Sequence, residues 1–254
     1  MTELLSWKSA LLEAAGLTGV FYGRVGGASS GELSSLNLGA QVGDSPAALA
    51  ENERRVLADL RAVGLYLPQQ IHGDQVCRVR HPVAGVVRGE PGDAVITDEV
   101  GLAIGVLTAD CVPILFGSRD GGAIGVIHAG WRGLRAGLIG RAIERFTGAF
   151  RYQPRDIVAA IGPAIGPRAY EVDRALAAEF LRERPELGGV IWPDRRRKPH
   201  LDLRLMALND LLGAGLESEA VEIVGPTTED ERFFSHRRSG GRAGRQLSAV
   251  LRNS

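Results

Sequence analysis

The stretch AIGVLTADCVPILFGSRDGGAIGVIHAGWRG, residues 103 to 133, decides the fold class. It contains the tetrapeptide AIGV twice, at 103–106 and 123–126, and each copy is followed by a branched aliphatic residue and then by Thr108 or His128. Between the copies lie the turn TADC, the short apolar run VPILF and the turn GSRDGG. Short apolar runs separated by turn residues are typical of strands, so we expect three strands that run up, down and up.

The expected strand directions bring reactive side chains to one place. The first and third strands run the same way, so Thr108 and His128 lie at the same end of the sheet. The TADC turn, which carries Asp110 and Cys111, lies at that end too. Proline cannot donate to a strand ladder, so Pro113 indicates that the middle strand is an edge strand or is bulged. We therefore expect an accessible rim that bears Asp110, Cys111 and His128.

The rest of the chain mixes helical and strand-like patterns. The predicted elements are helices at 48–64, 134–146, about 172 onward and about 203–212, and strands at QVCRV, AVIT, IVAAIG, VEIVG and QLSAVL. The segment 26–46 is rich in glycine and serine and is expected to be a long loop. We predict a single mixed α/β domain over residues 1–254, a sandwich with a largely antiparallel or mixed sheet flanked by helices.

Composition limits the classes of protein and function. Thirty basic side chains balance thirty acidic ones, so no overall field recruits nucleic acid or an anionic membrane. Two cysteines are too few for a disulfide framework, and the N-terminal segment lacks the pattern of a signal peptide. No apolar run reaches the roughly 20 residues that span a bilayer. The sequence predicts a soluble cytoplasmic protein whose partners are small molecules, and it leaves the oligomeric state open.

The motif HAGWRG, residues 128–133, joins an expected strand to an expected helix. An imidazole beside free backbone N–H groups and the guanidinium of Arg132 suits an anion or a metal-bound substrate. The alternative is that His128 is a hydrogen-bonded core residue, that Trp131 fills the core and that Arg132 lies on the surface. The local sequence leaves both interpretations open.

A third candidate ligand favours a metal site. His72 stands at the entrance of an expected strand in QQIHGDQV. Together His72, Cys111 and His128 supply two imidazoles and one thiolate, a set that fits a catalytic zinc ion with its fourth position open. The set also fits copper, which usually has a weak axial methionine. Met1 and Met206 are the only methionines and neither is near these motifs, so zinc is the expected metal and copper the alternative.

Six ordered motifs resemble one known family. They are SSLNLG with the following VGD, QQIHGDQV, TADCVPIL, HAGWRG, GPAIGPRAYEV and FFSHRR, and they extend over nearly the whole chain. In these motifs the chain is similar to the YfiH and laccase-domain family, also described as purine nucleoside phosphorylases. The resemblance implies a mixed α/β sandwich and a zinc site on His72, Cys111 and His128. It also implies phosphorolysis of adenosine, inosine and methylthioadenosine, and deamination of adenosine.

The implied reactions assign roles to further residues. For deamination, zinc would lower the pKa of bound water toward about 7 and a carboxylate would carry the proton, with Asp110 and Asp93 as candidates. Alternatively, Asp110 fixes the tautomer of a ligating histidine. For phosphorolysis, Arg132 and Arg237 are the best candidates to bind phosphate, because a guanidinium presents a fork of donors.

Three more polar residues are candidate substrate contacts. Asn37 and Gln70 carry amides that can bond ribose or base, although Asn37 is equally suited to capping the SSLNLG turn. Glu171, in the triplet YEV, is either a substrate contact or a carboxylate at a helix start.

Other functions stay open. Cys111 beside His128 is a common nucleophile and base pair, which favours a cysteine- or metal-dependent hydrolase; the family resemblance links such a role to editing of peptidoglycan precursors. A copper-dependent polyphenol oxidase of the laccase type is a second alternative, although five histidines are too few for a trinuclear copper cluster. A binding module is the weakest, because DRRRKPH (194–200) is the only basic run. The family resemblance favours, over these alternatives, a transferase or hydrolase that acts on a purine nucleoside with phosphate as co-substrate.

Overall fold

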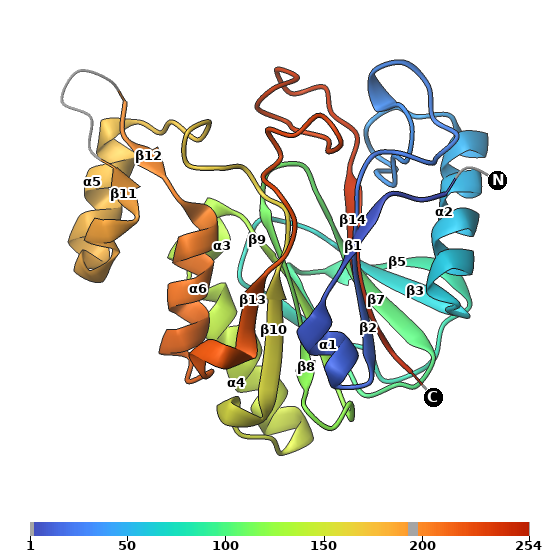
Figure 1. Ribbon diagram of the computed structural model, residues 1–254, viewed down its shortest axis with the longest axis horizontal. Coiled ribbons are helices and arrows are strands. Elements are labelled where there is room, and N and C mark those ends of the chain that lie inside the picture. The colour runs from blue at the N-terminus through green and yellow to red at the C-terminus, as the bar shows by residue number, and fades with distance from the viewer. Residues whose placement is uncertain (1–2, 193–197, 254) are drawn as a thin grey trace.

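A computed structural model describes residues 3–192 and 198–253, and most of the strands in these ranges form two sheets (Figure 1). The first sheet has the order β1 (Ser6–Lys8), β2 (Leu17–Tyr22), β14 (Gln246–Arg252), β7 (Leu102–Thr108), β3 (Gly64–Gln69), β5 (Gly85–Pro91). The second has the order β13 (Val221–Ile223), β10 (Ile157–Ile161), β8 (Val112–Ser118), β9 (Ile124–Ala129), β6 (Ala94–Thr97), β4 (Val76–Arg78). A separate pair consists of β11 (Ile191–Trp192) and β12 (His200–Leu201). Both large sheets mix parallel and antiparallel neighbours, which confirms the predicted mixed α/β class.

The two large sheets pack face to face around a shared apolar layer. Every second side chain of a strand points to the same face of its sheet. Ile104 and Val106 of β7 therefore meet Ile124 and Val126 of β9 between the sheets. The two AIGV copies thus place the same two side chains in one buried layer, one copy from each sheet.

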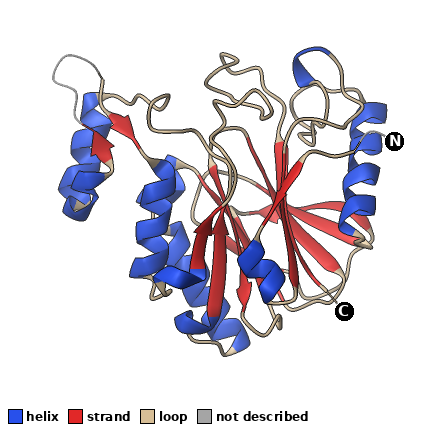
Figure 2. Cartoon of the chain, in the orientation of Figure 1, coloured by secondary structure: helices blue, strands red, loops and turns tan. Residues whose placement is uncertain are grey.

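Helices cover the outer faces of both sheets (Figure 2). The helix α2 (Pro46–Leu60) packs on the first sheet through Val56 and Leu60. The second sheet is covered by α4 (Leu138–Phe150) and α6 (Leu203–Gly213). The remaining helices are α1 (Ala10–Ala14), α3 (Trp131–Arg135) and α5 (Arg174–Glu183). The resulting order of layers is helix, sheet, sheet, helix, which buries both faces of the central strands.

The predicted succession of three neighbouring strands is wrong in one respect. β8 pairs with β9 as expected, but β7 lies in the other sheet, between β14 and β3. The TADC turn therefore crosses from one sheet to the other instead of closing a hairpin. Because the two sheets face each other, the ends of β7 and β9 still lie at the same rim, and Asp110, Cys111 and His128 still come together there.

The prediction that Pro113 marks an edge strand is also wrong. β8 lies inside its sheet, between β10 and β9. Pro113 is the second residue of that strand, and its carbonyl accepts a hydrogen bond of 2.8 Å from the N–H of Gly162. A proline near the start of a strand is tolerated when only its carbonyl is needed by the neighbour.

Two predicted helices have different bounds. The helix expected over 134–146 is divided into α3 and α4 at Gly137, whose φ of 76° is a left-handed conformation that favours glycine. The helix expected to end at Gly64 ends at Leu60, and Arg61 adopts the left-handed conformation that closes it. Gly64 instead begins β3.

Several strands were not predicted from the sequence, namely β1, β2, β3, β5, β11 and β12. The long loop over 26–46 is largely confirmed, apart from one short turn of 3₁₀ helix at Gly31–Leu33 and the first residue of α2. Residues 194–197 of the basic run DRRRKPH lie outside the described residues. Within the described ranges, no helix combines the length and apolar character that a bilayer crossing requires.

Candidate metal centre and substrate site

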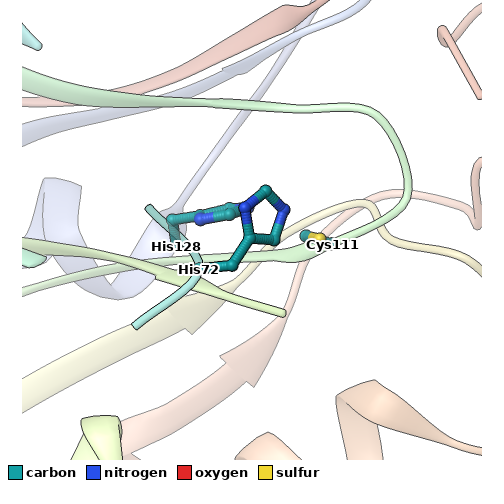
Figure 3. A group of neighbouring side chains, drawn as sticks. All are labelled: His72, Cys111 and His128. Atoms are coloured by element: carbon teal, nitrogen blue, oxygen red, sulfur yellow. The ribbon is translucent and has the colours of Figure 1, made fainter. Parts of the chain in front are cut away.

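The three candidate metal ligands converge at one rim of the sandwich (Figure 3). His72 follows β3, Cys111 lies in the turn between β7 and β8, and His128 lies near the end of β9. One ligand atom from each residue lies within 4.8 Å of the other two. The imidazole rings of His72 and His128 have centroids 4.8 Å apart and an interplanar angle of 84°. The fold therefore gathers two imidazoles and a thiol from three separate segments around one point.

Asp93 holds both histidine-bearing segments. Its side chain is fully buried, and Oδ1 accepts hydrogen bonds from Nδ1 of His128 (2.8 Å) and from the backbone N–H of His72 (3.0 Å). Its Oδ2 accepts a bond of 2.7 Å from the N–H of Gly73. A proton on Nδ1 of His128 leaves Nε2 free to act as a metal ligand. The same carboxylate stabilises the left-handed backbone of His72, whose φ is 57°.

The electrostatics of the centre favour an ionised thiol. Burial raises the pKa of Cys111, but the rings of His128 and His72 outweigh burial and hold this pKa below its ordinary value. Burial lowers the pKa of His128, but Cys111 and Asp93 outweigh it and raise this pKa. Burial likewise opposes ionisation of Asp93, but its hydrogen bonds from His128 and Gly73 keep the pKa of that carboxyl below its ordinary value. A thiolate is the form of cysteine that binds a metal ion or attacks an electrophile.

The surroundings of these side chains fit a metal ion. A Cβ atom at Gly130 would lie 3.2 Å from Sγ of Cys111 and 3.3 Å from Cδ2 of His72, so a larger residue would crowd both ligands. The hydroxyl of Thr108, three residues before Cys111, is buried and has no hydrogen-bond partner in the described part of the chain. Two imidazoles and a thiolate suit zinc with an open fourth position, and they also suit copper.

Asp110 joins the cysteine turn to two other segments. Its Oδ1 accepts a hydrogen bond from the hydroxyl of Thr228 (2.6 Å), and its Oδ2 accepts one from the backbone N–H of Arg237 (2.7 Å). Its carbonyl accepts a bond of 2.9 Å from the N–H of Ile165. Asp110 has a φ of 95°, a strained conformation for a residue with a side chain, and these bonds stabilise it. The bond that fixes a histidine tautomer is therefore made by Asp93 and not, as one prediction had it, by Asp110.

Arg132 presents an available cation beside the centre. It is exposed, and its guanidinium carbon lies 4.4 Å from the ring centroid of Trp131. Among residues 3–192 and 198–253 it has no ion pair. An open cavity of about 490 Å³ is lined by Trp131, Arg132, Arg135, Ala136 and Glu183. Arg132 thus combines free donors with a place where a ligand can approach.

Arg237 is more fully engaged. Its two terminal nitrogens donate to the carbonyls of Ala169 and Glu171, each at 3.1 Å. Its guanidinium carbon lies 5.1 Å from the ring centroid of Tyr170. Because its donors already hold protein carbonyls, Arg237 shapes the wall of the site more than it offers free donors to an anion.

The two predicted amide contacts serve the fold. Asn37 is fully buried; its Nδ2 donates to Oδ2 of Asp44 (2.7 Å) and to the carbonyl of Gly39 (3.3 Å), while its Oδ1 accepts from two backbone N–H groups. Gln70 bonds both the N–H (2.8 Å) and the carbonyl (2.7 Å) of Leu107 and so continues the pairing of β3 with β7. The hydrogen bonds of Asn37 match its alternative role as a turn cap.

Glu171 lies before α5 and not at its start. The helix begins at Arg174 with Asp173 as its N-cap, so the prediction of a helix-start carboxylate is wrong. Glu171 instead forms an isolated antiparallel bridge with His200, whose Nε2 lies 3.8 Å from Oε1 of Glu171. The carboxylate is exposed next to Tyr170 and remains available to a ligand.

Three further residues belong to the site but were not selected from the sequence: Tyr170, Thr228 and Arg245. Tyr170 and Arg245 are half-buried: burial raises the pKa of Tyr170 to about 12 and lowers the pKa of Arg245, which the charges of Cys111 and Asp110 oppose. Tyr170 stands in the YEV triplet, from which only Glu171 was selected as a candidate. Thr228 and Arg245 stand in segments without a chemical motif, and only the folded chain brings them here.

A sandwich of two mixed sheets with a His, Cys, His centre at its rim defines a class of α/β proteins built to bind a metal ion. The chain belongs to the family described as multi-copper polyphenol oxidoreductase laccase, whose model matches residues 18–253. This match covers nearly the whole chain and confirms the resemblance found in the motifs.

Named relatives and solved structures agree with this assignment. The chain is 35% identical to "Purine nucleoside phosphorylase YlmD" of Geobacillus stearothermophilus, over 89% of this chain and 87% of that protein. It is also 35% identical to "Purine nucleoside phosphorylase YfiH" of Escherichia coli, over 85% and 86%. The crystal structure of Bacillus licheniformis hypothetical protein YfiH superposes with a TM-score of 0.88 at 28% identity, covering 94% of both chains. The crystal structure of YlmD from G. stearothermophilus gives 0.86 at 31% identity, covering 100% of this chain and 98% of that one.

Proposed function

We propose that the protein is a zinc-dependent purine nucleoside phosphorylase. It would cleave adenosine, inosine or methylthioadenosine with phosphate, giving the free base and the ribose 1-phosphate, and would also deaminate adenosine. The observation that carries the proposal is the convergence of His72, Cys111 and His128 at an accessible rim, in a chain whose relatives at 35% identity are named purine nucleoside phosphorylases.

In this assignment His72, Cys111 and His128 hold the metal ion. When bound, the ion would supply an electrophilic centre to the substrate. Asp93 keeps Nδ1 of His128 protonated and fixes the turn that carries His72. Gly130 leaves the ligands the space that a side chain would take.

Arg132 is the proposed phosphate ligand. Phosphorolysis forms a bond between a phosphate oxygen and C1′ of the ribose and breaks the bond from C1′ to the purine nitrogen. The electron pair of the broken bond stays on the base, which takes up a proton. Arg132 balances the charge of the phosphate and orients it, because its fork of donors has no ion-pair partner among the described residues.

In both reactions Asp93 and Asp110 hold neighbouring segments of the site in place. Deamination replaces the amino group of adenosine with an oxygen from water and releases ammonia, so it needs proton transfer. Each carboxylate already accepts hydrogen bonds on both oxygens, from His128 and Gly73 in one case and from Thr228 and Arg237 in the other. We therefore assign neither of them the transfer of a proton to substrate.

A cysteine hydrolase is the second candidate, and a specific arrangement favours it. A nucleophile, a base and an orienting carboxylate are all present, as Cys111, His128 and Asp93. The Nδ1 atom of His128 lies 2.8 Å from Oδ1 of Asp93. Such an enzyme would attack an amide, as in a peptidoglycan precursor. Stoichiometric labelling of Cys111 by an electrophile in the metal-loaded protein would favour this candidate, because a thiolate bound to zinc is shielded.

Products of adenosine separate the candidates. Zinc-loaded, copper-loaded and metal-free protein are each incubated with adenosine, with and without phosphate, and the products are separated by chromatography. Adenine that forms only with zinc and phosphate supports the phosphorylase, and inosine in both zinc samples supports the deaminase. Absence of both products would overturn the proposal and leave the hydrolase, while oxidation of a phenol by the copper-loaded protein would support a polyphenol oxidase.

A further inference from the structure

The segment that carries Tyr170 runs beside the metal centre and is anchored to it. The N–H of Ile165 donates to the carbonyl of Asp110 at 2.9 Å, which ties the start of the segment to the residue before Cys111. The N–H of Tyr170 donates to the carbonyl of Gly166 at 3.1 Å. The ring of Tyr170 is half-buried and packs against the apolar cluster under the second sheet.

Arg237 fixes Tyr170 from both flanks. Its guanidinium holds the carbonyls of the residues before and after Tyr170, each at 3.1 Å, and lies over the aromatic ring. Its backbone N–H donates to Oδ2 of Asp110 at 2.7 Å. On the other side, the carbonyl of Tyr170 accepts a bond of 3.1 Å from the N–H of Leu201. The backbone on both sides of Tyr170 is therefore held in place, and the guanidinium of Arg237 packs over the ring.

Among the described residues the phenol of Tyr170 has no hydrogen-bond partner, although the charges of Cys111, Asp110 and two arginines act on it. Burial is the main cause that raises its pKa to about 12, and the charge of Cys111 adds to this while Arg237 and Arg132 oppose it. The hydroxyl therefore keeps its proton and is a donor at neutral pH. Within the described ranges it donates to no other residue.

We infer that Tyr170 orients the nucleoside, by donating a hydrogen bond from its hydroxyl to an acceptor atom of the purine base beside the metal centre. Arg237 is the positioning residue that holds the ring in place. The inference rests on the proposed function and adds to it a specificity-determining residue, since a base without an acceptor at that point would leave a rigid donor unpaired. The proposed function assigns the phosphate to Arg132.

The test is the substitution Tyr170→Phe, which removes the hydroxyl and keeps the ring. We expect the KM for the nucleoside to rise about fivefold to tenfold, the loss of one neutral hydrogen bond. The kcat, the KM for phosphate and the metal content should stay the same. Tyr152→Phe is the matched control, because its phenol bonds Asp120 at 2.9 Å and lies in another part of the fold. An unchanged nucleoside KM in Tyr170→Phe, or a fall in kcat with a shifted pH profile, would overturn the inference.

Arg237→Met provides a second test, a double-mutant comparison of the nucleoside KM. A purely structural role of Arg237 would not give the expected result. Arg237→Met should raise the nucleoside KM in the wild-type background and have no further effect in the Tyr170→Phe background, because it acts through the hydroxyl. Additive effects of the two substitutions would overturn the positioning role.

Calorimetry distinguishes a failure of the proposed function from a failure of the Tyr170 inference. It measures the binding of adenosine to the zinc-loaded wild-type protein and to the Tyr170→Phe variant. If the wild type binds adenosine but forms no product, the proposed function fails. Weaker binding by Tyr170→Phe would then still support the inference, and equal binding would overturn it. If the wild type turns over and both proteins bind equally, only the inference fails.

Discussion

The metal-ligand side of the site and its arginine and tyrosine wall are built in different ways. The ligand side rests on the ends of strands: His128 belongs to β9, and Asp93, which holds it, is fully buried directly before β6. The wall consists of two loop segments: the guanidinium of Arg237 donates to the carbonyls on either side of Tyr170 and lies over its ring. Loops supported by a rigid framework commonly carry substrate contacts. Under the proposed function, metal affinity and substrate recognition are therefore separable, and we expect substitutions on the two sides to have different effects.

Cys111→Ser should have the largest effect, because it removes the thiolate from the ligand side. We expect loss of stoichiometric metal and loss of phosphate-dependent base release, measured by elemental analysis and chromatography. Cys77→Ser is the control, since Cys77 is buried in the core and its thiol bonds the carbonyl of Pro91, at 3.4 Å. A Cys111→Ser protein that turns over at the wild-type rate without metal would refute the metal mechanism.

Asp93→Asn should come next. It leaves the ligands in place but removes the charge that orients His128 and the acceptor that holds the turn of His72. We expect metal affinity to fall about 10-fold to 100-fold and the free energy of unfolding to fall by about 3 kcal/mol, measured by metal competition and by urea titration. Asp98→Asn, at an exposed carboxylate 3.5 Å from Arg78, should change stability by less than about 1 kcal/mol. Equal effects at the two positions would contradict the orienting role of Asp93.

In helix α3, Arg132→Gln should raise the KM for phosphate about tenfold, since one charge-assisted hydrogen bond is lost. Metal content and the thermal midpoint should not change, because Arg132 is exposed and its guanidinium stacks on Trp131. Arg135→Gln is the matched control one turn further along the same short helix. Its guanidinium is already engaged by Glu183 and Glu179, so its phosphate KM should stay within about twofold. A wild-type phosphate KM in Arg132→Gln would remove Arg132 from the phosphate site.

The smallest effect is expected for Thr108→Val. The hydroxyl of Thr108 has no hydrogen-bond partner among the residues that the structure describes, and valine has the same shape. The free energy of unfolding of the metal-free protein should stay equal or rise by less than about 1 kcal/mol. In Thr228→Val the lost hydroxyl bonds Asp110, so that variant should be less stable by about 1–3 kcal/mol. Destabilisation by Thr108→Val of the same size would show that its hydroxyl has a partner after all.

The sequence predicts the metal-ligand side of the site better than the wall. His72, Cys111 and His128 could be selected because each stands in a short motif at the end of an expected strand, and the structure brings them within 4.8 Å of one another. The strand patterns of β4, β6 and β8 to β10 were readable for the same local reason. The placement of β7 was not, because the apolar pattern of AIGV is the same whether the strand neighbours β8 or faces it across the sandwich.

The wall could not be predicted, because its contacts join residues that are far apart in the sequence. Arg237 looked like a phosphate ligand, and only the folded chain shows its donors held by Ala169 and Glu171. Asn37 and Gln70 looked like substrate contacts because amides bind many partners, and no sequence pattern reveals that these amides bond backbone groups of the protein itself.

The position of β14 has a consequence for the order in which the molecule assembles. β14 (246–252) lies between β2 (17–22) and β7 in the middle of the first sheet, so no continuous fragment shorter than 17–252 contains these three neighbours. Contacts of such sequence separation slow folding. On the ribosome, the three proposed metal ligands, which all precede residue 129, are synthesised more than a hundred residues before the strand that completes the first sheet. The metal centre can therefore reach its final surroundings only after β14 has been made, so its assembly is a late event of biosynthesis.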